Sequence, residues 1–314
     1  MIEVQNLSVH FTTKSSKLFH KNLIRAVENV NLKIPENTIV GLVGESGCGK
    51  STLGRAIVKL LPLASGEIFY KGQEITHFKD SEFLKYRKDL QIIFQDPYSS
   101  LNPRFTIYEI LTEGLFTHFR LTSTEARKKV ISALEQMNLK PDILERYPHE
   151  FSGGQRQRIA IARVLVLEPK FVVCDEITSA LDVSNQAQVI NLLKDYKDKS
   201  NLSLLFISHD LNLVSYLSDE IAVMYLGKIV EHAKREDIIK NPLHPYTKAL
   251  YSNIFEINNF QKKREVLQGE IPGVIQKPSG CYFHTRCPIA KPICSQQAPP
   301  EKNLNGHKVA CHFV

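Results

Sequence analysis

The chain has 314 residues, more than one average domain, and 43% of them are hydrophobic, so we expect a main domain with an ordinary buried core and an appendage. No apolar run approaches the roughly 18 residues that cross a bilayer, and the N-terminus lacks the apolar stretch of a signal peptide, so we expect a soluble cytosolic chain. The formal net charge of +7, from 40 basic and 33 acidic residues, is scattered without basic blocks that contain aromatics, which predicts a mildly basic solvated surface and no nucleic-acid partner.

Three strands are predicted before the first helix. Residues 1–11 read as an edge strand, and residues 26–34 alternate apolar and polar side chains as strands do. Residues 12–24 are polar and rich in lysine, which is typical of a surface loop. Residues 35–37 then turn the chain into the short apolar run 39–43, which is suited to a buried strand.

A glycine-rich loop follows the third strand, and a helix is predicted after it over residues 50–61. The loop fits G-x-x-x-x-G-K-[ST], the phosphate-binding P-loop, whose glycines let backbone N–H groups point at phosphate oxygens. The helix N-terminus adds partial positive charge, Lys50 can reach the terminal phosphates, and Ser51 can supply a hydroxyl to Mg²⁺. We therefore predict a nucleoside triphosphate site rather than a chance glycine turn. Its residues are Gly44, Glu45, Ser46, Gly47, Cys48, Gly49, Lys50, Ser51 and Thr52.

Helices dominate the middle of the chain. A strand between glycine turns is predicted over residues 65–72, and the character changes to helical over residues 96–168. Helices are predicted over residues 106–119, from Thr122 with Glu125 as its capping box, and over residues 154–167. This pattern indicates a helical insert within an α/β domain.

Strands and helices alternate again after the insert. Buried-type strands are predicted over residues 171–174, 204–207 and 221–225, with an amphipathic helix over 184–199. Such alternation predicts a parallel sheet that is covered by helices on both sides.

Three apolar strands end in reactive residues: the P-loop, Asp175-Glu176 and Ser208-His209-Asp210. Ligands of open parallel sheets bind outside the carboxyl ends of the strands, so we expect one shared site. Asp175 stands where an acid holds Mg²⁺ after a buried strand. Because successive strand residues point to opposite sides, Glu176 is expected to face an attacking water. Either acid could instead cap the next helix.

These motifs, together with residues 151–155, resemble the ATP-binding cassette (ABC) ATPases over roughly residues 1–255. The stretch Phe151-Ser152-Gly153-Gly154-Gln155 is similar to the signature motif, with Phe where Leu is usual. The other family positions occur in order: Phe11 resembles the adenine-stacking aromatic, Gln95 the Q-loop glutamine, Asp182 in Ser179-Ala180-Leu181-Asp182 the D-loop, and His209 the switch histidine. Ile177 stands where the family usually has Pro.

The resemblance implies an α/β fold: a P-loop NTPase cassette with a parallel core sheet, an antiparallel β subdomain and the helical insert. It also implies a head-to-tail pair, in which the P-loop of one cassette and Ser152, Gly153, Gly154 and Gln155 of the other enclose each ATP. ATP would then join the pair, and hydrolysis would release it. A second anion-binding helix N-terminus at Ser152 agrees with this, although a serine-capped helix with a glycine turn is the simpler alternative.

The implied catalytic roles follow the family motifs. Lys50 and the loop amides hold the β- and γ-phosphates, while Ser51, Asp175 and Gln95 hold Mg²⁺. Glu176 orients or deprotonates the water, and His209 contacts the γ-phosphate.

Residues 256–314 differ in composition from the rest of the chain. Proline and glycine are frequent, and four of the six cysteines form C-x5-C-x6-C-x16-C: Cys281, Cys287, Cys294 and Cys311. Residues 241–250, 279–281 and 286–288 resemble the C-terminal extension of oligopeptide and dipeptide importer ATPases, some of which hold a [4Fe-4S] cluster on four such cysteines. The alternative is four reduced thiols in a small appended fold. Cys48 and Cys174 read as packing residues.

The predicted function is that of the ATPase subunit of an importer for oligopeptides or dipeptides, peripheral on the cytoplasmic side of the cell membrane. The resemblance implies two membrane-spanning permease subunits, contacted through residues 96–103, an external substrate-binding protein, and a second similar ATPase or a second copy.

An importer ATPase for nickel or another small solute remains an alternative. So does a non-transport ABC ATPase, although such proteins usually carry two cassettes or a long coiled coil. A regulatory GTPase would need an N-K-x-D motif, which is missing, and a redox-sensing binding module would not need Glu176 and His209.

Overall fold

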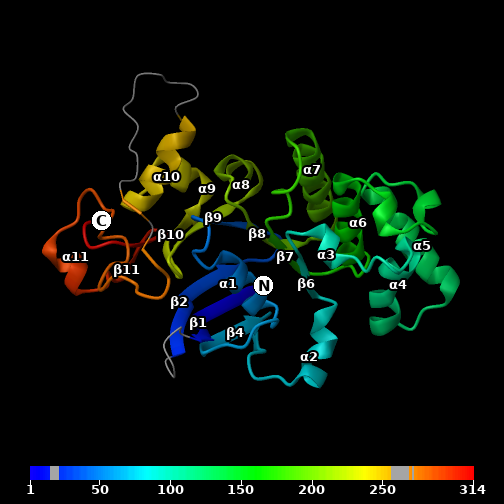
Figure 1. Ribbon diagram of the computed structural model, residues 1–314, viewed down its shortest axis with the longest axis horizontal. Coiled ribbons are helices and arrows are strands. Elements are labelled where there is room, and N and C mark those ends of the chain that lie inside the picture. Colours follow the sequence, from blue (N-terminus) through cyan, green and yellow to red (C-terminus); the bar gives the residue numbers. More distant parts are fainter. Residues whose placement is uncertain (15–20, 256–268, 271) are drawn as a thin grey trace. The chain divides into compact units, whose positions relative to one another are not determined.

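The computed structural model describes residues 1–14, 21–255, 269–270 and 272–314 (Figure 1). It divides into two compact units, which are described separately. Unit 1 comprises Met1, Ile34–Thr38 and Ile75–Phe206, and unit 2 comprises Ile2–Lys33, Ile39–Glu74 and Ile207–Val314.

Unit 1 contains three neighbouring strands, in the order β8 (Ser203–Ile207), β7 (Phe171–Asp175) and β6 (Leu90–Ile93). Strands β6 and β7 run parallel, with Leu90 opposite Phe171 and Ile93 opposite Cys174. Every residue of β7 and β8 is buried. These continuous apolar runs are typical of strands covered on both faces, which explains why both were predicted from sequence.

The helical insert forms most of the rest of unit 1. Helices α4 (Ile107–His118), α5 (Ser123–Gln136) and α6 (Gly153–Leu165) pack against one another (Figure 1). The predicted capping box of α5 is confirmed: Glu125 N donates to Thr122 Oγ1 at 3.3 Å, and Thr122 N donates to Glu125 Oε2 at 2.8 Å. The other helical elements of unit 1 are α2 (Asp80–Arg87), α3 (Pro97–Ser100), η1 (Pro141–Ile143), η2 (Pro148–Glu150) and α7 (Val183–Ser200).

Unit 2 holds the predicted β subdomain. Its four-stranded sheet has the order β2 (Lys21–Ile34), β1 (Ile2–Lys14), β4 (Ser65–Tyr70) and β5 (Gln73–Glu74). Strand β4 runs antiparallel to both β1 and β5, with Ile2 opposite Tyr70. The alternating apolar residues of β2 that predicted a strand are all buried: Val27, Val30, Leu32 and Ile34. The sheet order places β1 between two strands, so its predicted edge position is wrong. The predicted surface loop over residues 12–24 is wrong at both ends, because residues 12–14 end β1 and residues 21–24 begin β2, and residues 15–20 lie outside the described residues.

Five further strands of unit 2 belong to the eight-stranded sheet of the chain, from the P-loop strand to the C-terminal strands. Strand β3 (Ile39–Val43) runs parallel to β9 (Glu220–Tyr225), and β9 runs antiparallel to β10 (Lys228–Lys234). Strand β12 (His307–Ala310) pairs with β10, and β11 (Glu301–Leu304) pairs with β12, both antiparallel. The last strands of the tail therefore extend the edge of this sheet, which the sequence pattern did not predict.

Five helices accompany the sheets of unit 2 among the described residues: α1 (Lys50–Ile57), α8 (Leu211–Leu217), α9 (Arg235–Lys240), α10 (Pro245–Phe255) and α11 (Pro292–Gln296). The first is shorter than predicted. It ends because Lys59 takes a left-handed backbone, with φ 56°, and Leu60 N bonds Arg55 O at 2.9 Å, which closes the last turn instead of continuing the helix.

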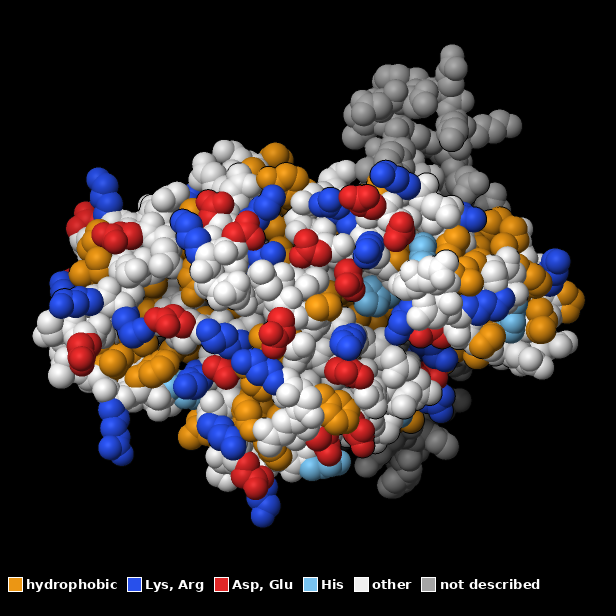
Figure 2. Space-filling model, turned by 180° about the vertical axis from the view of Figure 1, so that it is seen from behind, with side chains coloured by type: hydrophobic (Ala, Val, Ile, Leu, Met, Phe, Trp, Pro, Cys, Tyr) orange, Lys and Arg blue, Asp and Glu red, His pale blue; other side chains and the backbone are white. Residues whose placement is uncertain are grey.

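The surface and the helix lengths agree with the composition. On the face shown in Figure 2, Lys and Arg side chains intermix with Asp and Glu rather than gathering into one basic block. None of the helices in the described part of the chain is both long and apolar enough to cross a membrane.

Candidate nucleotide-binding and hydrolysis site

The P-loop of unit 2 has a backbone that needs glycine. Gly44 follows the buried strand β3 with φ 152°, and a Cβ atom there would lie 2.2 Å from Met224 O. Gly49 has φ 107°, and its Cβ would lie 2.4 Å from Ala26 O. A side chain at either position would therefore displace neighbouring backbone, and the loop could not wrap closely around a phosphate chain.

Lys50 is the first residue of α1 and is buried. Its Nζ donates to Gly44 O at 2.8 Å and to Glu45 O at 3.1 Å, so the ammonium group lies inside the loop. No side chain caps the start of α1, and its first turn has no acidic residue. The loop thus combines a cation, a helix N-terminus and closely wrapped amides, which is the chemistry that binds phosphate.

In unit 1, Gln95 contacts Glu176. Gln95 Nε2 donates to Glu176 Oε2 at 3.1 Å and to Ser179 Oγ at 3.3 Å, and Ser179 Oγ donates to Glu176 O at 2.9 Å. These bonds orient the Glu176 side chain and the turn that carries it. The structure therefore brings together two residues that are far apart in the sequence and that the motifs predicted for one site.

The two acids after β7 differ in environment. Asp175 is buried at the end of the strand, whereas Glu176 is partly exposed and has a left-handed backbone with φ 50°. A non-glycine residue in that conformation stores strain, which is found most often at functional sites. Neither acid caps the next helix, because the N-cap of α7 is Asp182. That alternative reading of the two acids is therefore wrong.

Asp182 caps α7 through Asn185, whose N and Nδ2 donate to the Asp182 carboxylate at 2.9 and 2.6 Å. The backbone hydrogen bond from Asn185 is the main reason that the pKa of Asp182 is lowered. The carboxylate is therefore charged and fixed in direction at the start of α7.

The signature stretch begins α6. Gln155 N donates to Ser152 Oγ at 3.4 Å, and Ser152 N donates to Gln155 Oε1 at 3.1 Å, which forms a capping box. A Cβ on Gly154 would lie 3.0 Å from Asn185 Oδ1, whereas Gly153 has only Tyr98 Oη nearby, at 3.8 Å. The structure therefore shows a serine-capped helix start. Both interpretations of this stretch, a second anion-binding site and a simple capped helix with a glycine turn, predict that feature.

The remaining predicted residues lie in unit 2. Phe11 is on β1 and is 37% exposed, and His209 is exposed between β8 and the N-cap of α8, Asp210. The P-loop, Phe11 and His209 thus belong to unit 2, whereas Gln95, Ser152, Asp175, Glu176 and Asp182 belong to unit 1.

The comparisons with known proteins agree with this geometry. Residues 27–179 match the family described as "ABC transporter", and residues 230–294 match "Oligopeptide/dipeptide transporter, C-terminal region". The oligopeptide transport ATP-binding protein AppF of Bacillus subtilis (strain 168) is 46% identical over 320 residues, which cover 100% of this chain and 97% of AppF. The chain belongs to the ABC transporter family. OppF of Salmonella typhimurium, also named as an oligopeptide transport ATP-binding protein, is 47% identical over 99% of this chain and 95% of its own length.

Solved structures confirm the ABC cassette fold. Two structures of the ATP-binding cassette MJ0796 match with a TM-score of 0.66, at 28% and 30% identity, and cover 75% of this chain and 99% of theirs. Both are described as dimeric, and one is bound to ADP and phosphate. The predicted P-loop NTPase fold, with its helical insert and antiparallel subdomain, is therefore correct.

This ABC chain departs from the family motifs at two positions, and an apolar side chain is buried at each of them. Phe151, where Leu is usual, is buried, and the Arg146 guanidinium lies 4.7 Å from its ring centroid. Ile177, where Pro is usual, is also buried. Both residues pack in unit 1, so neither change exposes apolar surface at the site.

The four tail cysteines lie in unit 2 as free thiols, with Cys281 N donating to Cys294 O at 2.7 Å. Burial raises the pKa of Cys281 and of Cys287, and the neighbouring cysteines raise it further. Within residues 1–14, 21–255, 269–270 and 272–314, no group of three or more His, Cys, Asp or Glu side chains could hold a metal ion. The four cysteines as placed therefore do not form the four-thiolate site that the suggested iron–sulfur cluster needs.

Sequence reasoning missed two residues that hold the P-loop in this ABC protein. Tyr246 of α10 accepts a hydrogen bond from Glu45 N at 3.0 Å, and Arg286 of the tail binds the Glu45 carboxylate. Both lie within segments that resembled the importer extension. No local pattern could have paired them with Glu45, because Arg286 is 241 residues away in the sequence.

Proposed function

We propose that this chain is the ATP-hydrolysing subunit of an ABC importer for oligopeptides or dipeptides. The observation that carries the proposal is the similarity to oligopeptide transport ATP-binding proteins along the whole chain, which includes the C-terminal region. Similarity confined to the cassette would support an ABC ATPase of any cargo.

The reaction is the hydrolysis of ATP to ADP and phosphate. The oxygen of a water molecule bonds to the γ-phosphorus, the bond from that phosphorus to the β–γ bridging oxygen breaks, and the water proton passes to the Glu176 carboxylate. Gln95 supports this role because its hydrogen bond to Glu176 Oε2 fixes the direction of the carboxylate. His209 contacts the γ-phosphate, and Phe11 offers an exposed ring on which adenine can stack.

Lys50 and the P-loop amides hold the β- and γ-phosphates. The Lys50 ammonium exchanges its bonds to Gly44 O and Glu45 O for phosphate oxygens. Ser51, Asp175 and the Oε1 atom of Gln95 are oxygen donors of the kind that Mg²⁺ prefers, so these three residues fit the ion. When it is bound, Mg²⁺ neutralises charge on the phosphate oxygens.

A second cassette completes the site. ABC cassettes such as MJ0796 form dimers. In this chain, Ser152, Gly153, Gly154 and Gln155 at the start of α6, with Asp182 at the start of α7, enclose the ATP held by the P-loop of the partner. The partner is a second homologous ATPase or a second copy of this chain, because both would present the same motifs.

The membrane partners are two permease subunits, and an external binding protein delivers the cargo to them. Residues 96–103, directly after Gln95, contact the permeases. Tyr98 in this segment is 58% exposed, so it offers an aromatic surface next to the residue that bonds Glu176. The chain is thereby held peripherally at the cytoplasmic side of the membrane.

Transport by the assembled complex tests the proposal. The full chain with its permeases and partner ATPase, reconstituted in liposomes with the binding protein, is expected to take up a labelled tripeptide only when Mg-ATP is present. Uptake of nickel without uptake of peptide would assign the cargo to a small solute instead. If the ATPase activity were the same with and without the permeases and the binding protein, the result would favour a non-transport ABC ATPase.

The iron–sulfur cluster is not part of this proposal, because the tail cysteines do not form a metal site in the structure. A visible absorption band in protein purified without oxygen, lost in Cys294→Ser, would contradict this reading and restore the cluster.

A further inference from the structure

An acidic side chain occupies the loop that binds an anion. Glu45 is the second residue of the P-loop, and its carbonyl oxygen lies 3.1 Å from Lys50 Nζ. Its carboxylate would repel a triphosphate in this loop unless its charge were neutralised. The structure supplies one neutralising group: Arg286 Nη1 and Nη2 donate to Glu45 Oε2 and Oε1 at 2.7 and 2.9 Å. This is a bidentate, charge-assisted pair.

Arg286 is held in place by aromatic residues. Its side chain is only 5% exposed, and its guanidinium lies 5.9 Å from the ring centroid of Tyr225, whose hydroxyl accepts a weaker bond from Nη1 at 3.5 Å. Tyr225 packs on Tyr246 with ring centroids 4.7 Å apart, and Phe283 packs against both rings. The hydrogen bonds to Glu45 raise the pKa of Arg286, so the guanidinium stays charged.

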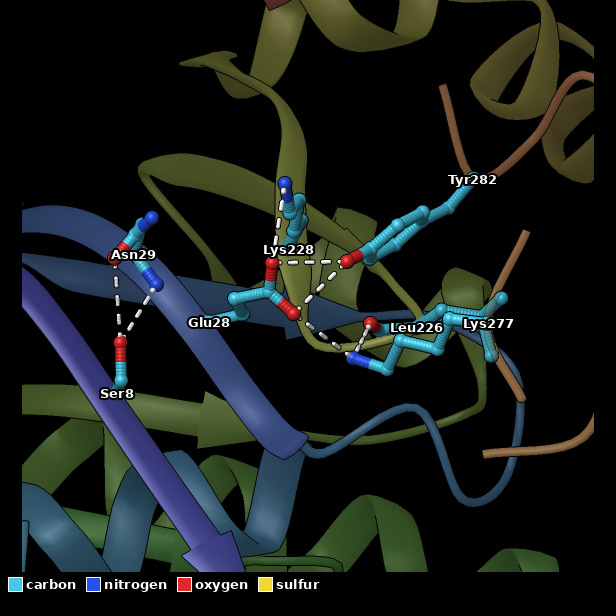
Figure 3. Close-up of polar contacts among 7 residues, drawn as sticks. All are labelled: Ser8, Glu28, Asn29, Leu226, Lys228, Lys277 and Tyr282. Atoms are coloured by element: carbon cyan, nitrogen blue, oxygen red, sulfur yellow. Dashed lines mark hydrogen bonds and ion pairs between the residues drawn. The ribbon is translucent and has the colours of Figure 1, made fainter. Parts of the chain in front are cut away.

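A second contact anchors the same part of the tail (Figure 3). Tyr282 Oη donates to both carboxylate oxygens of Glu28 on β2 at 2.8 Å, and Lys277 Nζ lies 3.7 Å from Glu28 and donates to Leu226 O at 2.6 Å. Lys228 also pairs with Glu28, at 3.6 Å. These contacts hold residues 277–282, which lead to Arg286, against β2 and against the turn between β9 and β10.

That turn is itself bonded to the P-loop. Gly227 N donates to Cys48 O at 2.8 Å, and Glu28 N donates to Gly227 O at 2.9 Å. The loop is therefore fixed at two points, at Cys48 through the β9–β10 turn and at Glu45 through Arg286 and Tyr246. The C-terminal tail contacts the loop directly at Glu45, through Arg286. It contacts Cys48 indirectly, because Tyr282 binds Glu28, and Glu28 is bonded to Gly227.

We propose that Arg286 is a positioning residue for nucleotide binding, which neutralises Glu45 and thereby makes the ATP affinity of the P-loop depend on the C-terminal tail. The tail then does more than extend the sheet, because it supplies the positive charge that an acidic P-loop residue requires. This inference rests on the proposed function only in that the loop binds ATP.

The test separates charge from packing with a pair of substitutions. The full chain is purified as wild type, Arg286→Met, Arg286→Lys and the double variant Glu45→Gln/Arg286→Met, and the Kd for Mg-ATP is measured by calorimetry. Arg286→Met leaves Glu45 unneutralised and is expected to raise Kd by about 10- to 100-fold. The double variant removes both charges and is expected to recover to within about 3-fold of wild type, with Arg286→Lys in between.

Kinetics and salt give two further readouts, of which the salt dependence separates lost charge from lost packing. In the assembled transporter, Arg286→Met is expected to raise KM for ATP while kcat changes less than about 2-fold, because the residue acts before the chemical step. The loss is expected to shrink as ionic strength rises, because salt screens the repulsion from Glu45. Lys308→Met is the matched control, because Lys308 is a tail cation paired with Glu301 rather than with the loop.

Two results would overturn the proposal. One is an Arg286→Met protein with an unchanged melting temperature and a wild-type Kd. The other is a double variant that binds ATP as weakly as Arg286→Met, which would mean that lost packing is responsible. A wild-type chain that binds no ATP would instead contradict the proposed function.

Discussion

Replacing Glu176 by glutamine is expected to lower steady-state ATP hydrolysis at least about 100-fold while ATP binding is retained. Glutamine has the size of glutamate and keeps a side-chain oxygen. That oxygen can still accept the hydrogen bond that Gln95 Nε2 donates to Glu176 Oε2 at 3.1 Å. Glutamine cannot accept the proton of the attacking water. Binding depends on the P-loop of unit 2, which this substitution does not touch.

The measurement is phosphate release by the assembled transporter, together with calorimetric binding of Mg-ATP to the isolated full chain. Glu135→Gln, on the exposed face of α5, is the matched control for the loss of one carboxylate. Hydrolysis by Glu176→Gln within about 3-fold of the control would remove Glu176 from the catalytic role assigned to it.

Replacing Lys50 by methionine is expected to weaken ATP binding at least about 100-fold, because the ammonium is the one P-loop side chain that can neutralise the terminal phosphates. Methionine fills a similar volume but carries no charge and no donor. Since Lys50 is buried and bonds Gly44 O and Glu45 O, its loss also leaves two loop carbonyls without these donors.

Equilibrium binding of Mg-ATP checks this, with Lys33→Met as the control, because Lys33 is an exposed lysine of β2. Thermal unfolding of both variants separates a lost ligand contact from a lost fold. If a folded Lys50→Met chain bound ATP like the control, the loop would not be the triphosphate site.

Predictions from the sequence succeeded where the signal is local. The P-loop strand is a continuous buried run, its loop is a spaced glycine motif, and the Thr122–Glu125 capping box spans one helical turn. Strands without such a signal were missed. Strand β6 has only four residues, and β10 mixes charged and apolar residues because it lies between an inner strand and the tail.

The residues that contact across long sequence separations could be found only in part. Gln95 and Glu176 were assigned to one site from family motifs, and their hydrogen bond agrees with that assignment. The cluster suggested for the cysteine pattern came from its resemblance to the importer extension, with four reduced thiols as the alternative, and the tertiary structure does not arrange those thiols around a metal. Spacing along the chain does not define the distances between side chains in a segment with little regular structure.

The sequence by itself determined the cassette and its nucleotide chemistry, because phosphate binding requires glycines, a lysine and a helix start within a few consecutive residues. Only the tertiary structure decided what the tail does at the loop. The Glu45–Arg286 pair joins residues 241 positions apart and forms because the aromatic rings of Tyr225, Tyr246 and Phe283 pack together. Such packing depends on the whole fold of unit 2, and no short stretch of sequence encodes it.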